Sequence, residues 1–137
     1  MELRIENGFN NGWLFDRMNN FWMQDGGAVR HMVPAADVVE DKDAYRFYFE
    51  MPGLKSESLD VKVEDDRLVV AAERIRPELP EHAEVHLAER GYGWIRRAFE
   101  LPSDAGHDHI HASYKDGVLE VTVEKRPESK PVKIQIN

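Results

Sequence analysis

The 137-residue sequence contains no cysteine. It therefore has no disulfides, no thiolate ligands for zinc and no cysteine nucleophile, which is consistent with a reducing compartment. Basic residues are also few, since 18 Lys and Arg stand against 26 Asp and Glu and give a formal net charge of -8. This charge disfavours proteins that bind nucleic acid or anionic membranes through a basic surface. We therefore expect no nucleic-acid partner.

Long apolar runs and a signal peptide are absent as well. No apolar stretch approaches the ~18 residues needed to span a bilayer. The N-terminal sequence MELRIENGFN has no basic segment followed by an apolar run. We therefore expect a cytoplasmic protein without stable membrane insertion, and the length of 137 residues suits one domain.

Motifs for nucleotide binding and for hydrolysis are missing. The sequence contains neither Gly-x-x-x-x-Gly-Lys-Ser/Thr nor Gly-x-Gly-x-x-Gly, and no serine lies in a Gly-x-Ser-x-Gly motif. Acidic residues are so frequent that a pair of carboxylates says little about acid–base catalysis. We therefore expect a protein that is not an enzyme, without catalytic residues or a cofactor.

From Ala36 onward, apolar residues alternate with polar ones, which predicts β-strands. Turn residues such as Asp65-Asp66 and Asp116-Gly117 separate the runs, and Asp-Gly between two such runs is a strong hairpin signal. About seven short strands without an interior helix predict an all-β, immunoglobulin-like antiparallel sandwich over residues 34–124. After the first run at Ala36, strands are expected at residues 45–51, 59–63, 68–72, 94–101, 110–114 and 118–123.

Residues 1–33 differ in composition and form an N-terminal arm. Apolar residues at spacings of three and four predict one face of a short helix, which is marginal in water by itself. Because the sandwich has its own apolar set, we expect this stripe to be buried in another subunit or another protein. The apolar stripe consists of Trp13, Leu14, Phe15, Met18, Phe21, Trp22 and Met23.

Two further segments do not fit a regular sandwich. Residues 74–91 are long for a hairpin loop and contain two prolines, with a candidate short strand at residues 84–88. Residues 125–137 form a charged extension that ends in alternating β-branched residues. Such an end is typical of a strand that pairs with a sheet edge.

Histidines are the polar residues whose spacing suggests a site. His107, His109 and His111 alternate, so on a strand all three would lie on one face, and His82 and His86 are four apart. The solvent face of a half-buried strand shows the same spacing. We therefore favour surface histidines over a metal site or a pH-responsive cluster, and we assign no metal ligand.

Several motifs occur together in a characteristic order. They are Ala36-Asp37-Val38, Met51-Pro52-Gly53-Leu54, Glu89-Arg90-Gly91-Tyr92-Gly93, Arg97-Ala98-Phe99-Glu100-Leu101-Pro102, the run from Ala112 to Leu119, and Ile134-Gln135-Ile136. In this order they resemble the small heat-shock protein family, whose shared part is the α-crystallin domain. The resemblance covers residues 34–137 and implies an ATP-independent holdase chaperone. Such a protein binds partly unfolded client proteins and assembles into homo-oligomers from dimers.

The resemblance also implies roles for individual residues. Clients would bind the apolar stripe of the arm. The tail residues Ile134 and Ile136 would dock on a neighbouring subunit, with Val132-Lys133-Ile134 as a second register. The docking groove would be lined by Val61, Val63, Ile110 and Ala112. The dimer interface would contain Glu84, Val85, His86, Leu87, Ala88 and Arg97.

Two other classes of protein fit parts of the sequence. A β-sandwich adaptor, similar to co-chaperone domains of this architecture, would need neither the aromatic arm nor the terminal Ile-x-Ile motif. A metal-binding protein that uses the histidine row would change its assembly or thermal stability when zinc is added.

Overall fold

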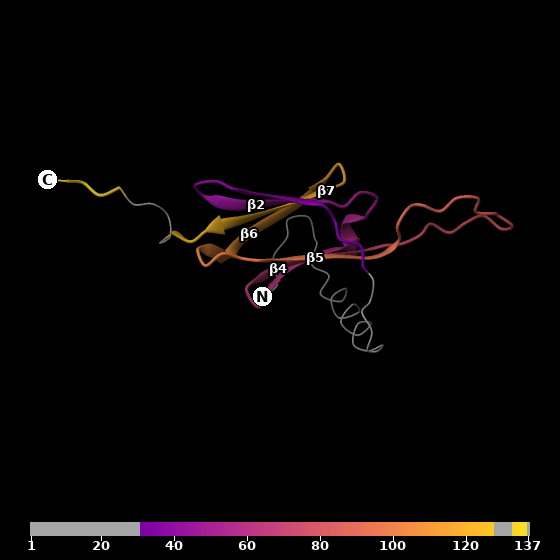
Figure 1. Cartoon of the computed structure of the whole chain (residues 1–137), viewed down its shortest axis with the longest axis horizontal. Coiled ribbons are helices and arrows are strands. Elements are labelled where there is room, and N and C mark those ends of the chain that lie inside the picture. Colours follow the sequence, from indigo (N-terminus) through magenta and orange to yellow (C-terminus); the bar gives the residue numbers. More distant parts are fainter. Residues whose placement is uncertain (1–30, 128–132, 137) are drawn as a thin grey trace.

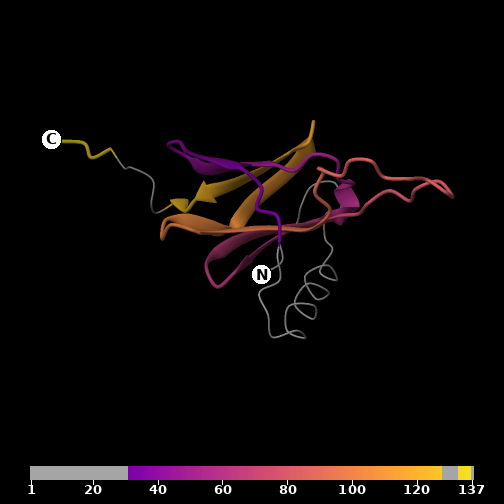
Figure 2. The ribbon, with the colours of Figure 1, turned by 45° about the vertical axis from the view of Figure 1, so that its right-hand side comes forward.

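The computed structural model describes residues 31–127 and 133–136. In this part of the chain, seven strands form two antiparallel sheets that stack as two layers (Figure 1 and Figure 2). One sheet has the strand order β1-β2-β7-β6 and the other the order β3-β4-β5. The predicted all-β sandwich is therefore confirmed. Its elements are β1 (Ala36–Glu40), β2 (Ala44–Glu50), a 3-10 turn η1 (Ser56–Ser58), β3 (Leu59–Glu64), β4 (Arg67–Arg74), β5 (Gly93–Glu100), β6 (Ala105–Lys115) and β7 (Val118–Lys125).

The core lies between the two sheets because one side of each strand is apolar. On β2, the side chains of Tyr45, Phe47 and Phe49 point inward, as the alternating pattern predicts, and all three are buried. The ring of Phe99 on β5 lies 5.6 Å from that of Phe47 and 6.0 Å from that of Phe49. These aromatic contacts place β5 over β2.

The burial pattern shows how the remaining strands of the two sheets overlap. Most of β1 is exposed, whereas Ile110 and Ala112 of β6 are buried in the core. Since β5 lies over β2, the three-stranded sheet must extend toward β6 and not toward β1. This arrangement places β3 opposite β6 at one edge of the sandwich and leaves β1 overhanging at the other.

Two tight hairpins have the turn chemistry that the sequence predicts. Asp65 and Asp66 between β3 and β4 have φ angles of 50° and 60°, and Asp116 and Gly117 between β6 and β7 have 54° and 77°. Two successive positive φ angles define the turn whose twist matches that of the flanking strands. Gly117 also lies close to Pro52, because an added Cβ would be 3.1 Å from the Pro52 Cβ.

The structure differs from the sequence prediction in two segments. Strand β6 begins at Ala105, whereas residues 110–114 were predicted. Residues 84–88 form no strand, and the loop that contains them projects from one end of the sandwich (Figure 1). A lone segment without a neighbouring sheet edge has no partner for its backbone groups, so a strand does not form there.

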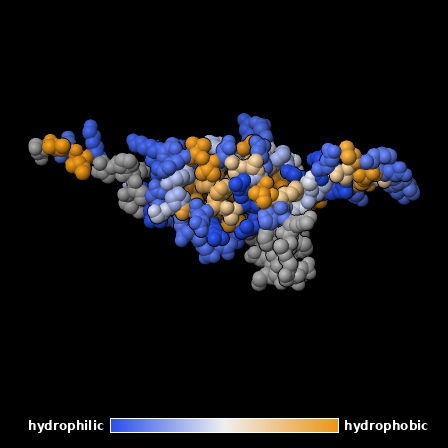
Figure 3. Space-filling model, viewed as in Figure 1, coloured by the Kyte–Doolittle hydropathy of each residue, from blue (hydrophilic) through white to orange (hydrophobic). Residues whose placement is uncertain are grey.

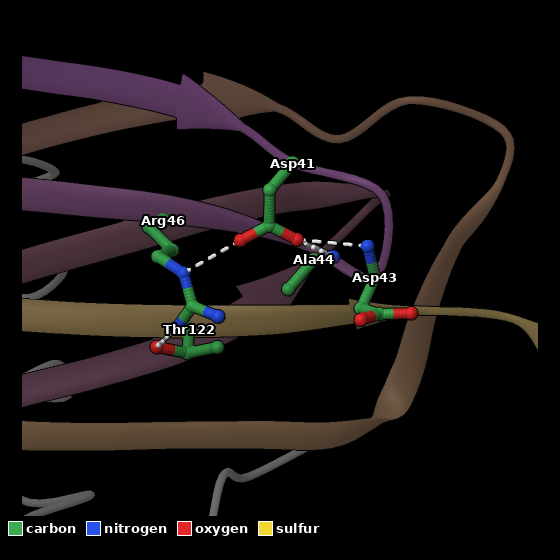
Figure 4. Close-up of polar contacts among 5 residues, drawn as sticks. All are labelled: Asp41, Asp43, Ala44, Arg46 and Thr122. Carbon is green, nitrogen blue, oxygen red and sulfur yellow. Dashed lines mark hydrogen bonds and ion pairs between the residues drawn. The ribbon is translucent and has the colours of Figure 1, made fainter.

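The outer surface of the four-stranded sheet is polar, and we call it the four-stranded outer face. It is formed by Arg46, Tyr48, His111, Ser113, Glu120 and Thr122. At its rim, the Arg46 guanidinium donates from Nε to Asp41 Oδ2 at 2.9 Å and from Nη1 to Thr122 Oγ1 at 3.4 Å (Figure 4). The backbone N–H groups of Asp43 and Ala44 donate to Asp41 Oδ1. The Asp43 bond and then Arg46 lower the pKa of Asp41 below its ordinary value.

Candidate assembly surfaces

Three end strands in the described part of the chain have a neighbouring strand on one side only. Strands β1 and β6 lie at the two ends of the four-stranded sheet, and β3 lies at one end of the other. The remaining end strand, β5, is extended by Met32, whose N–H donates to the Trp94 carbonyl at 2.8 Å and whose carbonyl accepts from Arg96 at 3.0 Å. Free strand edges attract further strands. The edge strands of the sandwich are therefore β1, β3 and β6.

Strand β1 is the most exposed of these edges. Its two β-branched residues, Val38 and Val39, are about half exposed to solvent. Backbone groups without a ladder partner lie beside apolar side chains along this edge, and both favour the addition of a strand from another chain.

Strands β3 and β6 carry the residues predicted to line the tail-docking groove. Val61 and Val63 are 2% and 4% exposed, and Ile110 and Ala112 are 6% and 3% exposed. The structure brings all four together at the edge where β3 lies opposite β6, but as members of the core cluster. A docking tail would have to compete with this existing packing.

The tail itself carries two strongly exposed isoleucines. Ile134 and Ile136 are 82% and 95% exposed, and residues 133–136 lie at the end of the molecule opposite the projecting loop (Figure 1). Leaving two large aliphatic side chains in water forgoes roughly 1.5–3 kcal/mol of burial free energy for each. The tail is therefore suited to contact another apolar surface.

The projecting loop contains the residues predicted for the dimer interface. Glu84, His86 and Ala88 are exposed, and so are Val85 and Leu87, with Leu87 at 75%. Figure 3 shows apolar residues on this loop, as on the tail. In a single chain these side chains point into solvent.

Arg97 lies on β5 between Ile95 and Phe99 along the inner side of the strand. Its Nη1 donates to the Pro34 carbonyl at 2.8 Å, and its guanidinium carbon lies 4.8 Å from the centre of the Phe99 ring. The Arg97 side chain thus holds the segment between Met32, which pairs with β5, and the start of β1. The sequence did not predict this backbone partner, because every residue has a carbonyl oxygen and the residue type does not show which one Arg97 binds.

The three alternating histidines do not share one face, and this prediction is wrong. Between Ala105 and Ile110 strand β6 advances five residues while its partner advances only two, from Lys125 to Val123, so the alternation is broken. His107 Nδ1 lies 3.7 Å from Asp66 Oδ1, in a turn of the other sheet, whereas His111 Nε2 lies 3.9 Å from Glu124 Oε1.

Neither a metal centre nor a membrane segment is found in the residues described. Within residues 31–127 and 133–136, no group of three or more His, Asp or Glu side chains is placed to hold a metal ion. In the same residues, no helix is long and apolar enough to cross a membrane. The apolar stripe at residues 13–23 lies outside the described part of the chain, so its role stays a prediction.

One apolar surface was not predicted from the sequence. On β4, Val69 and Ala71 point away from the core, yet they are 3% and 0% exposed, and Trp94 and Ala98 of β5 pack against them. The available signal was the run Leu68-Val69-Val70-Ala71-Ala72, which is apolar without alternation. Such a run indicates a strand buried on both faces.

Comparison with known proteins decides the family. Residues 37–137, nearly all of the sandwich and the whole tail, match the Hsp20/alpha crystallin family. The chain belongs to this family. This match confirms the family resemblance found in the sequence. Members of the Hsp20/alpha crystallin family are chaperones.

Relatives within the Hsp20 family include bacterial and plant proteins. The chain is 35% identical over 122 residues to spore protein SP21 of Stigmatella aurantiaca, which covers 89% of this chain and 72% of that protein. It is 37% identical over 133 residues to a 17.6 kDa class II heat shock protein of Arabidopsis thaliana, and this match covers 96% of this chain and 84% of that protein. A solved small heat-shock protein from Xylella fastidiosa, described as having a distinct high order structure, superposes with a TM-score of 0.66 at 30% identity, over 79% of this chain and 99% of that one.

Proposed function

We propose that this chain is an ATP-independent holdase chaperone that binds partly unfolded proteins and prevents their aggregation under heat or other stress. The family match over residues 37–137 carries this proposal. The sequence supports it, because no nucleotide-binding motif is present and no residue set suggests catalysis. The absence of cysteine fits a reducing, cytoplasmic place of action.

Client binding is assigned to the apolar stripe of the arm. Unfolding proteins expose apolar surfaces of no fixed shape, so a surface that captures them must be apolar and adaptable. The stripe combines aromatic rings with the flexible thioethers of Met18 and Met23. No folded pocket is needed for this kind of recognition.

The tail is proposed to link subunits. Ile134 and Ile136 are two residues apart, so they point to the same side of an extended segment. Burying both is worth about 3–6 kcal/mol before the cost of ordering the tail. At the edge where β3 lies opposite β6, the tail would lie along two end strands, and its isoleucines would have to displace part of the packing around Val61 and Ile110.

The dimer is proposed to form by strand exchange. The loop residues Val85 and Leu87 are exposed on one chain, and the free edge of β1 with Val38 and Val39 is exposed on the other. Adding residues 84–88 of one subunit to β1 of its partner would pair backbone groups and cover apolar side chains together. Arg97 lies near this edge through its bond to Pro34.

The holdase proposal is tested with a pair of double variants in the full chain. Phe15→Ser with Phe21→Ser should reduce protection of a heated client, measured by light scattering at equal subunit ratio, at least several-fold. The matched control, Asn19→Ser with Asn20→Ser, changes polar residues of the same segment and should protect like the unmodified protein. Equal protection by both pairs would move capture away from the stripe, and any dependence on ATP would contradict the holdase proposal.

Tail-mediated assembly is tested in the same manner. Ile134→Ala with Ile136→Ala should reduce the oligomer to dimers or small assemblies in native mass spectrometry. Lys133→Ala with Gln135→Ala alters the intervening positions and should leave the subunit number unchanged. An unaltered mass in the isoleucine variant would exclude the tail as the link.

Strand exchange is tested in the loop. Val85→Asp with Leu87→Asp should weaken the dimer at least tenfold, since charges would be placed where apolar side chains are covered. Glu78→Ser with Glu81→Ser, at exposed positions of the same loop outside residues 84–88, is the control and should change dimerisation little. Dissociation constants that are equal for both pairs would argue against this interface.

A further inference from the structure

The outer surface of the three-stranded sheet is unlike a solvent-exposed face, and we call it the three-stranded outer face. It comprises Asp60 and Lys62 of β3, Val69 and Ala71 of β4, and Trp94, Arg96 and Ala98 of β5. The centre of this face is apolar, with Val69 at 3% and Ala71 at 0% exposure. Charged side chains surround the centre on the two flanking strands.

The burial of this face requires a further layer of protein. Asp60 lies on an end strand and points away from the core, yet it is only 4% exposed. Carboxylates are almost never this buried at the surface of a single sheet, because desolvation of the charge is costly. Neighbouring side chains of a flat sheet stand beside Asp60 and do not lie over it. Something must therefore cover the three-stranded outer face.

We propose that residues 1–30 of the same chain dock on the three-stranded outer face through their apolar stripe. The position at which the described chain begins supports residues 1–30 as the covering segment. Met32 runs parallel to β5 and bonds to Trp94 and Arg96, so residue 31 lies beside the Trp94 end of that strand. The thirty preceding residues thus start next to the face that needs covering.

The dimensions of the two partners agree. The predicted helix at residues 13–23 would be about 16 Å long. Three strands at a spacing of about 4.8 Å place β3 and β5 about 10 Å apart. The helix is therefore long enough to cross the whole sheet, and the small side chains of Ala71 and Ala98 leave room for its aromatic residues.

Tethering favours the arm of the same chain over a separate partner. The bonds of Met32 hold the end of the arm at the edge of β5, which gives the stripe a high effective concentration at this face. Gly91 supports the tether, because an added Cβ would overlap the Met32 sulfur. Docking would cover the apolar stripe when no client is bound. Clients would then compete with the three-stranded outer face for the stripe, and this consequence alone rests on the proposed function.

A crosslinking experiment in the full-length protein tests the docking. The chain has no cysteine, so Met18→Cys with Ala98→Cys leaves one reactive pair. A short bis-maleimide should join the arm to the three-stranded outer face. Met18→Cys with Ser113→Cys is the matched control, since Ser113 lies on the four-stranded outer face, and its yield should be at least several-fold lower.

Isotope mixing identifies whose arm is bound. Light and heavy-nitrogen preparations are combined until native mass spectrometry shows oligomers of mixed isotope composition. They are then crosslinked, and crosslinked peptides of uniform isotope composition are expected. Peptides of mixed composition would show that the arm of a neighbouring subunit covers the face and would overturn the assignment to the same chain. Equal yields from both cysteine pairs would overturn the docking itself.

A third substitution tests whether the crosslink depends on the apolar centre of the three-stranded outer face. Ala71→Lys in the Met18→Cys, Ala98→Cys background should abolish the product, while Glu120→Lys on the four-stranded outer face should not. Circular dichroism verifies that each variant keeps its β-signal. If the Ala71→Lys variant does not fold, the comparison of Ala98 with Ser113 still decides the outcome. No client is used, so a failed aggregation assay and a failed crosslink are separate results.

Discussion

The two sheets share one core but have opposite outer faces. On the four-stranded outer face, Arg46 reaches Asp41 and Thr122, and His111 and Ser113 are exposed. On the three-stranded outer face, Val69 and Ala71 are as buried as the core itself. The first face is polar and exposed to solvent, whereas the centre of the second is apolar and buried.

This difference shows that packing the two sheets together does not cover every apolar side chain of the strands. Strand β4 carries apolar residues on both sides, with Val70 in the main core and Val69 in a separate small cluster. A central strand with two apolar sides needs a layer over each. In this domain one layer is the other sheet, and we assign the other to the arm.

The largest expected difference between the faces comes from an added charge. Ala71→Asp places a carboxylate at a fully buried position and should lower the free energy of unfolding by roughly 2–5 kcal/mol. Ser113→Asp adds the same group at an exposed position and should change it by less than about 0.5 kcal/mol. Urea unfolding followed by circular dichroism measures both. A small loss for Ala71→Asp would mean that this face can be hydrated.

A smaller difference is expected when methyl groups are removed. Val69→Ala should cost about 1–2.5 kcal/mol of unfolding free energy, because it leaves a cavity on the three-stranded outer face. Val39→Ala removes the same atoms from a half-exposed position on β1 and should cost about 0.5 kcal/mol or less. Thermal unfolding of the two variants side by side measures the difference. Equal losses would show that both valines are covered alike in the assembled protein.

The smallest expected effect concerns charge on the polar face. Hydrogen bonds from Asp43 and Arg46 lower the pKa of Asp41 below its ordinary value of 3.8. A lowered pKa in the folded state stabilises the fold above the unfolded-state value, and this contribution is lost as the pH falls through the folded pKa. The wild type should therefore be slightly more stable than Asp41→Asn at neutral pH. This advantage should begin to decrease as the pH falls to about 3.8 and should vanish below the lowered pKa of the folded state.

Melting temperatures measured from pH 7 to pH 2 test this dependence. Asp108→Asn serves as the control, because it makes the same chemical change in the exposed, irregular part of β6. The effect is small because the side chains of Asp41 and Arg46 are 41% and 37% exposed, and solvent screens their interaction. An advantage that persists in acid would show that the Asp41 carboxylate is not its source.

The strands and hairpins could be predicted because their causes are local. Alternation of Phe47 and Phe49 with polar neighbours specifies which side of β2 is buried. Asp116 and Gly117 accept the positive φ angles that a tight hairpin needs. These features depend on residues close together in the sequence, so the pattern alone reveals them.

The histidine row and the role of Arg97 could not be predicted in the same way. A bulge in β6 breaks the alternation that would align His107 with His111, and its position is set by pairing with β7. The Pro34 carbonyl that Arg97 binds comes from a segment 63 residues away. Neither partner has a local sequence signal.

The sequence by itself determined the strand pattern, the turn types and the family, because these follow from local alternation and from ordered motifs. Only the tertiary structure decided that β3 lies opposite β6, that β1 remains a free edge and that the outer face of the three-stranded sheet is buried. These features depend on which strands become neighbours and on how two layers overlap. Alternation states that a side chain is buried, but the packing of the layers decides what buries it.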